Sequence, residues 1–422
     1  MQRSESLYQE SVRLTPAGVS SPVRKFDPYP LYIAKGEGCR VTDADGNTYV
    51  DMCMAYGPLI TGHAHPKVMD AIRDQLARGT VYGAPSEQEL ALLKRINREV
   101  PSAEMVRLAC SGTEATMHAI RVARGVTGKD GIVKMNGGFH GAHDAVLVNA
   151  GSGSAGGVPS SKGVPADIAK HTYTAEYNDA EGMAQLLERQ KDIACVIMEP
   201  IMGNVGVVTP NKGYLEEVRR ITRENDVILI FDEVITGFRA SSGGAQKRYG
   251  VTPDMTTMAK IVGGGLPAGA FMGRRDIMEN VAPQGPVYVA GTFAGNPASA
   301  AAGLAQIDVM CSDDNYSKLE RTTESLVSAL RDTMADAGIR GCINSVASMF
   351  SIFFGLDSVE NGAQAMGTDR QMFSRLFRYM LEHGVYLPPS ALEVDFMSIA
   401  HDEEAVQKLE DAFAGFARDV RQ

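Results

Sequence analysis

Short apolar runs alternate with stretches of helical periodicity between about residue 61 and residue 290. Runs of about four to eight apolar residues are typical of buried strands, whereas apolar residues three and four positions apart are typical of amphipathic helices. The alternation predicts an α/β fold, with a mostly parallel sheet and helices on both faces. Ligands of such sheets bind at the carboxyl ends of the strands. The predicted strands are Met105 to Ala109, Gly131 to Met135, Ala145 to Val148, Ala194 to Met198 and Val227 to Phe231, and the clearest helices are Asp179 to Arg189 and Gly213 to Glu224.

The two ends of the chain follow different patterns. Near the N-terminus we expect a helix from Leu7 to Arg13 and an antiparallel meander from Ile33 to Val50, because an Asp-Gly-Asn turn divides the meander. Beyond about residue 300, two long predicted helices each have an apolar face, and the last one opens with acidic residues and ends with arginines, as the helix dipole favours. We therefore expect an N-terminal segment of residues 1–60, a large domain of residues 61–299 and a smaller α+β domain of residues 300–422.

Composition and charge exclude several classes of protein. The 422 residues are 44% apolar and 22% charged, which is ordinary for a globular protein. The net charge of −10 and the lack of a Lys/Arg run argue against nucleic-acid binding. No apolar signal core opens the sequence, and no apolar run approaches the roughly 18 residues of a membrane span. With six cysteines and no CxxC pair, we expect a cytoplasmic protein with reduced thiols and no membrane segment.

A run of small and polar residues, Ser111 to Thr116, follows a predicted strand and opens a predicted helix. Small residues expose backbone N–H groups there, and a helix N-terminus carries positive potential, so the run could bind a phosphate. The alternative is an ordinary N-cap.

Two further glycine-rich runs have both a structural and a functional interpretation. In Gly137 to Gly141, Phe139 could stack on a flat ring or could pack in the core beside a turn. The run from Gly151 to Pro165 could be a surface loop or a lid over an active site. Neither His140 nor the pair His63 and His65 has the spacing of a metal site, so we expect no metal.

Asp232 and Lys260 form the most suggestive pair in the sequence. Asp232 ends the predicted strand at Phe231, and Lys260 precedes the three glycines 263–265. Pyridoxal phosphate requires an amine to hold its aldehyde and an anion to keep its ring nitrogen protonated. Taken alone the pair is weak evidence, because most such aspartates belong to turns and most lysines are solvated.

Taken together, these residues resemble the class III (fold type I) pyridoxal-phosphate aminotransferases, and especially their aminomutase branch, from about Leu7 to the C-terminus. The motifs that carry the resemblance are Ser21-Pro22-Val23-Arg24, Gly57-Pro58-Leu59-Ile60, Gly62-His63-Ala64-His65-Pro66, Ser111-Gly112-Thr113-Glu114-Ala115-Thr116, Phe231-Asp232-Glu233-Val234, Gly237-Phe238-Arg239, Gly243-Gly244-Ala245-Gln246, Gly291-Thr292, Gly295-Asn296-Pro297 and Gly384-Val385-Tyr386-Leu387-Pro388-Pro389-Ser390.

The resemblance implies a role for each matching residue. Lys260 matches the lysine that holds the cofactor and later moves protons, and Asp232 the partner of the pyridinium nitrogen. Thr292 matches a residue that reaches the phosphate across the interface of a homodimer. The remaining cofactor residues are Gly112 and Thr113 at the phosphate, Val234 against the ring, Phe139 where the family usually has a stacking Tyr, and Asn204.

On the substrate side, Arg24 matches the anchor for a carboxylate, Ser152 lies in the gating loop, and Glu393 stands where ordinary class III aminotransferases have a second Arg. A glutamate there should repel dicarboxylate amino acceptors, so that exchange occurs within one molecule by way of the pyridoxamine form of the cofactor. The resemblance implies conversion of glutamate 1-semialdehyde to 5-aminolevulinate, a tetrapyrrole precursor, with glutamyl-tRNA reductase as a possible partner. A class III aminotransferase or an amino-acid racemase is the alternative, because Tyr56 replaces the usual Trp beside the substrate and the sequence from Gly141 to Asp144 is altered.

Overall fold

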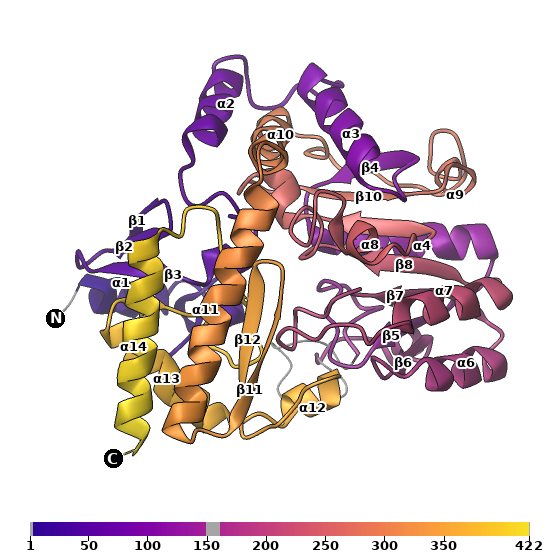
Figure 1. The fold of residues 1–422 in the computed structure, drawn as a ribbon. Coiled ribbons are helices and arrows are strands. Elements are labelled where there is room, and N and C mark those ends of the chain that lie inside the picture. The colour runs from indigo at the N-terminus through magenta and orange to yellow at the C-terminus, as the bar shows by residue number, and fades with distance from the viewer. Residues whose placement is uncertain (1–2, 149–160, 422) are drawn as a thin grey trace.

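The computed structural model describes residues 3–148 and 161–421, and Figure 1 shows their helices arranged around three sheets. The largest sheet has seven strands in the order β4-β10-β9-β8-β7-β5-β6. β10 runs antiparallel to both of its neighbours, and all other pairs are parallel. The predicted α/β architecture is confirmed. The strands are β4 (Met105–Ala109), β5 (Gly131–Met135), β6 (Thr172–Ala175), β7 (Ile193–Met198), β8 (Ile228–Asp232), β9 (Met255–Met258) and β10 (Gly269–Gly273).

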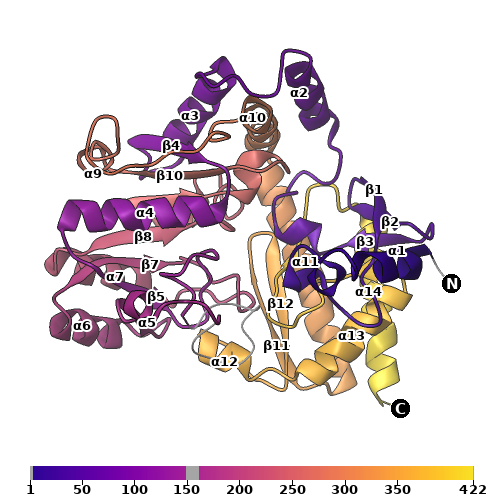
Figure 2. The same cartoon turned by 180° about the vertical axis from the view of Figure 1, so that it is seen from behind.

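Successive side chains of a β-strand point to opposite faces of the sheet. Neighbouring residues of the central strands therefore pack against helices on opposite faces. Ile132, Cys195 and Ile230 share a core with α4 (Gly112–Thr127) and α9 (Arg275–Met278). Their chain neighbours Val133, Val196 and Leu229 share the other core, with α6 (Ala180–Arg189) and α7 (Tyr214–Glu224). Figure 2 shows α4 on one side of the sheet, and Figure 1 shows α6 and α7 on the other.

One predicted strand is wrong, and three strands of the seven-stranded sheet were not predicted. The segment from Ala145 to Val148 forms turns, with Val146 N–H donating to the His143 carbonyl at 3.1 Å. Its side chains are apolar because they are buried, not because they pair in a sheet. The missed strands β6, β9 and β10 are rich in Thr, Met and Gly, so they lack the continuous apolar run that marked the others.

The meander near the N-terminus forms as predicted and joins the C-terminal part of the chain. β1 (Ile33–Glu37), β2 (Arg40–Asp43) and β3 (Thr48–Asp51) are antiparallel, and β3 pairs in parallel with β13 (Val385–Tyr386). The helix before them, α1 (Arg3–Ser11), begins earlier than predicted because its first N–H groups bond to Asp45. The boundaries of the three predicted units stay a prediction.

The C-terminal part contains a second small sheet and long helices. β12 (Met349–Phe354) pairs with β11 (Gly341–Val346) and with β14 (Asp395–Phe396). The two amphipathic helices predicted there are α11 (Asn315–Ala337) and α14 (Glu403–Arg421), whose predicted apolar residues are largely buried.

Along the described parts of the chain, no helix combines the length and apolarity needed to cross a membrane. The other helices are α2 (Pro66–Leu76), α3 (Glu87–Glu99), α5 (Ala166–Ala169), α8 (Gly244–Tyr249), α10 (Pro297–Cys311), α12 (Gly362–Met366) and α13 (Arg370–Glu382), and the 3₁₀ turns are η1 (Pro16–Gly18), η2 (Pro22–Arg24), η3 (Met54–Tyr56) and η4 (Lys260–Gly263).

Candidate active site

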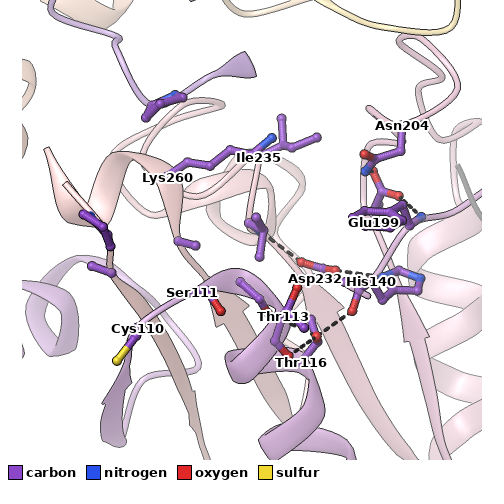
Figure 3. A pocket seen from close by; sticks show the side chains of 18 of the residues that line it. Cys110, Ser111, Thr113, Thr116, His140, Glu199, Asn204, Asp232, Ile235 and Lys260 are labelled. Atoms are coloured by element: carbon purple, nitrogen blue, oxygen red, sulfur yellow. Dashed lines mark hydrogen bonds and ion pairs between the residues drawn. The ribbon is translucent and has the colours of Figure 1, made fainter. Parts of the chain in front are cut away.

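A cavity of about 460 Å³ lies where β5, β7 and β8 end and α4 begins. Figure 3 shows side chains that line it. This is the edge at which parallel sheets hold their ligands. The cavity brings together segments that are distant in the sequence, from the start of α4 to the turn after β9. The residues with predicted cofactor roles that line it are Gly112, Thr113, Phe139, Asn204, Asp232, Val234 and Lys260.

Asp232 is the last residue of β8, and three donors fix the orientation of its buried carboxylate. His140 Nδ1 lies 2.7 Å from one oxygen, Oδ2, as the dashed line in Figure 3 shows. The other oxygen, Oδ1, accepts from the Thr257 hydroxyl and from Val234 N–H, each at 3.1 Å. A carboxylate held in this way is suited to bond a protonated ring nitrogen, because little rotational freedom is left to lose.

Lys260 is the first residue of η4 and has the left-handed backbone that L-residues seldom adopt, with φ of 48°. Helix α10 packs directly against this turn. A Cβ added to Gly303 of α10 would lie only 1.8 Å from the Val262 carbonyl oxygen. Burial lowers the pKa of the Lys260 amine to about 8, and the Glu393 and Glu199 carboxylates partly offset that effect. A lysine with this pKa is a far better nucleophile near neutral pH than an ordinary one.

The N-terminus of α4 faces the same cavity. Ser111 is the N-cap, and its hydroxyl accepts from Glu114 N–H at 3.1 Å, as the alternative interpretation of this run expected. The N–H groups of Gly112 and Thr113 remain without a partner among the described residues. A Cβ on Gly112 would lie 3.0 Å from both γ carbons of Val234, so this position has little room for any other residue. Free N–H groups at the start of a long helix are suited to bind a phosphate.

Glu199 follows β7 and organises the opposite wall of the cavity. Its Oε1 accepts from Phe139 N–H at 3.1 Å, and its Oε2 accepts from Gly203 N–H at 2.8 Å and from the Asn204 amide at 2.9 Å. Burial raises the pKa of Glu199, while His140 and the N–H groups of Gly203 and Phe139 act in the opposite sense. Phe139, which is 38% exposed, therefore has its backbone fixed and its ring available at the cavity.

The sequence did not assign site roles to His140, Glu199 and Thr116. His140 is buried, bonds Asp232 and has no partner for its Nε2 among the described residues. Thr116 donates its hydroxyl to the His140 carbonyl at 2.5 Å. The sequence offered one signal for Glu199, which is its position. It follows β7, the strand that pairs with the strand of Asp232.

Tyr56 and Glu393, two of the substrate residues predicted from the resemblance, lie near Lys260, and neither they nor Arg24 line the cavity. A Cβ on Gly57, the residue after Tyr56, would lie 3.4 Å from Lys260 Cδ, and the Glu393 carboxylate raises the pKa of both Lys260 and Tyr56. Arg24 influences the pKa of Tyr386, another electrostatic neighbour of Tyr56. The Arg24 side chain is exposed and forms no ion pair within residues 3–148 and 161–421.

The other two predicted residues are not brought into the cavity. Thr292 is exposed and lies outside the cavity lining, next to Phe293, which is 59% exposed. Ser152 and most of the predicted lid, Gly151 to Pro165, lie outside the described residues. Of the three histidines considered for a metal, His63 pairs with Asp51 and His140 with Asp232, each at 2.7 Å.

Comparison with known proteins identifies the family to which these residues belong. The profile of the aminotransferase class-III family matches residues 22–412. A protein of Archaeoglobus fulgidus named glutamate-1-semialdehyde 2,1-aminomutase is 52% identical over 413 residues, which cover 98% of each chain. Among solved structures, an omega-transaminase from Sphaerobacter thermophilus is 31% identical with a TM-score of 0.94, over 100% of this chain and 98% of that one. A variant of a glutamate-1-semialdehyde-aminomutase from Pseudomonas aeruginosa in complex with PMP is 26% identical with a TM-score of 0.88, over 98% of this chain and 94% of that one. The chain belongs to the class III aminotransferase family.

Proposed function

We propose that this protein converts (S)-glutamate 1-semialdehyde to 5-aminolevulinate, a precursor of tetrapyrroles, by moving an amine within one molecule. The relative from Archaeoglobus fulgidus that carries the aminomutase name spans 98% of the chain. The observation that carries the proposal is the Glu393 carboxylate, which lies close enough to the Lys260 ammonium to raise its pKa. A carboxylate at that position disfavours a second carboxylate on the substrate, and with it the usual dicarboxylate amino acceptors.

The residues of the cavity fit pyridoxal 5'-phosphate and its pyridoxamine form. The N–H groups of Gly112 and Thr113 would hold the phosphate, with Val234 and Phe139 against the ring. Asp232 would bond the ring nitrogen, and Lys260 would bond the aldehyde. The cofactor, when bound, supplies an electron sink and an amine that can be exchanged.

The work of the protein is to position the substrate and to move protons. The Lys260 amine is poised to take and return a proton at the substrate carbon, because burial brings its pKa close to neutral pH. Arg24 has no competing carboxylate among the described residues and would bind the single carboxylate of the substrate. Asn204 and Phe139, both fixed by Glu199, would hold the wall against which the cofactor lies.

The decisive experiment is turnover of glutamate 1-semialdehyde by the holoenzyme with no keto acid added. Formation of 5-aminolevulinate under these conditions is the expected result, since the amine leaves and re-enters the same molecule. Absolute dependence on an added amino acceptor would contradict the proposal and favour an aminotransferase. Formation of the mirror-image amino acid would favour a racemase.

We also propose a homodimer in which Thr292 of each subunit binds the cofactor phosphate of the other. Thr292 and Phe293 are exposed and outside the cavity of their own chain, while Tyr288 nearby is 72% exposed. Exposed aromatic residues grouped in one segment are typical of a protein interface. Delivery of the substrate by glutamyl-tRNA reductase stays a prediction.

A further inference from the structure

Tyr56 belongs to a turn with an unusual backbone. Met54, Ala55 and Tyr56 have successive φ values of 43°, 54° and 64°, in the left-handed region that costs free energy for residues other than glycine. Asp51 compensates, because its Oδ1 accepts from the N–H groups of Cys53 at 2.9 Å and of Met54 at 3.0 Å. A turn held at such cost is well defined, and so is the direction of the side chain that it carries.

The Tyr56 side chain crosses to a segment 33 residues earlier in the chain. Its hydroxyl donates to the Val23 carbonyl at 2.7 Å. The other hydrogen bonds of this segment are local, such as Arg24 N–H to the Ser21 carbonyl at 3.1 Å. The Tyr56 hydroxyl therefore holds the backbone of Val23, the residue before Arg24, by a contact between segments that are distant in sequence. The bond is partly buried, so its loss leaves a carbonyl with a weaker replacement in water.

Arg24 itself has little else to determine its position. Its neighbour Lys25 pairs with Asp27 at 3.0 Å and lies 5.2 Å from the ring of Tyr8. Within the described parts of the chain, Arg24 has neither an ion pair nor a side-chain hydrogen bond. The backbone of η2, to which the Tyr56 hydroxyl is bonded, therefore fixes the point from which the Arg24 side chain extends.

We infer that Tyr56 is a positioning residue, whose hydroxyl holds the backbone of Val23 and Arg24 so that the Arg24 guanidinium meets the substrate carboxylate. This inference rests on the proposed function, which makes Arg24 the carboxylate anchor. It changes the role of Tyr56 from a wall of the substrate pocket to a residue that acts through Arg24. Because the carboxylate is bound equally in the ground state and the transition state, the effect belongs to substrate binding rather than to the chemical step.

The test is Tyr56→Phe in the holoenzyme, which removes only the hydroxyl. We expect KM for glutamate 1-semialdehyde to rise about tenfold while kcat changes by less than about threefold. Calorimetric titration with levulinate, a five-carbon monocarboxylate without an amine, should show a similar loss of affinity. An unchanged KM and an unchanged levulinate affinity would overturn the inference.

A double-mutant cycle with Arg24→Ala separates positioning from a general structural effect. If Tyr56 acts through Arg24, Tyr56→Phe should have almost no further effect on KM or on levulinate affinity once Arg24 is alanine. Equal losses in both backgrounds would show that the hydroxyl acts by another route and would overturn the inference.

The matched control is Tyr316→Phe. The Tyr316 hydroxyl donates to the Phe238 carbonyl at 2.9 Å, a bond of the same kind and similar burial that does not involve the Arg24 segment. We expect both single variants to lower the melting temperature by similar amounts, and only Tyr56→Phe to raise KM. Failure of the proposed function would look different, because the wild-type protein would then not turn over the semialdehyde, while the levulinate titration would still test the role of Tyr56.

Discussion

At the scale of single residues, the pKa of Lys260 predicts how the apoprotein captures its cofactor. Only the neutral amine attacks an aldehyde, and burial lowers its pKa from 10.5 to about 8. The neutral fraction therefore rises about tenfold per pH unit below pH 8 and is nearly constant above it. We expect the rate of reaction of the apoprotein with pyridoxal phosphate to level off near pH 8, as followed by stopped-flow absorbance. A rate that still climbs toward pH 10, as for butylamine under the same conditions, would contradict this prediction.

Replacement of Lys260 should separate the chemistry from cofactor binding. Lys260→Ala removes the amine that moves the proton, so we expect turnover to fall by at least about a thousandfold. The N-terminus of α4 and the carboxylate of Asp232 remain, so cofactor should still copurify with the variant and be released by denaturation. The exposed Lys247, whose ammonium bonds Ser242, provides the control, and Lys247→Ala should keep full activity. Full activity of Lys260→Ala would refute the assignment of this lysine.

Local sequence was sufficient to select Asp232 and Lys260, because a carboxylate at a strand end and a lysine before three glycines are visible without long-range information. The partners of these residues were not visible. His140 pairs with Asp232 across 92 positions, and the Tyr56 hydroxyl reaches Val23 across 33. A hydrogen bond of this kind depends on how strands and turns are brought together, so no spacing in the sequence could predict it.

At the scale of elements, the start of α4 requires a residue without a side chain at Gly112. A methyl group there would lie 3.0 Å from both γ carbons of Val234 and would force that side chain toward the cavity. We expect Gly112→Ala to weaken cofactor affinity by about tenfold or more, measured by fluorescence titration of the apoprotein. Val234→Ala should restore much of the affinity when the two changes are combined. Gly128→Ala at the C-cap of α4, where a Cβ meets nothing within 4 Å but φ is 69°, is the control: it destabilises the same helix without contacting the cavity.

The prediction of elements succeeded where the pattern of burial was simple. β7 and β8 are buried along their whole length, so their apolar runs were recognised. β9 is equally buried, but its two threonines bond other polar side chains, which hides the strand in the sequence. The opposite error occurred from Ala145 to Val148, where burial produced an apolar run without any strand.

At the scale of the whole molecule, the two ends of the chain lie together beside the large sheet. The pairing of β3 with β13 joins residues near position 50 to residues near position 385. This arrangement brings Glu393, after β13, near Tyr56, just after β3, and near Lys260. The periodicity of each segment was readable, but their pairing across more than 300 residues was not. Thr292, by contrast, is exposed on the surface of its own chain and is not brought to this site.

A mixing experiment distinguishes a Thr292 that serves the neighbouring subunit from one that serves its own. We consider Lys260→Ala and Thr292→Asp, the second of which places a carboxylate against the phosphate and should abolish cofactor binding. If Thr292 acts across the interface, each mixed dimer contains one site with both changes and one site with neither. Mixed dimers form about half of an equal mixture after unfolding and refolding together, so activity should recover to roughly a quarter of the wild-type value. If Thr292 acts within its own subunit, every site keeps one defect and the mixture stays inactive. Each variant refolded alone is the control, and light scattering of the wild-type protein must give the mass of a dimer for the result to be interpreted.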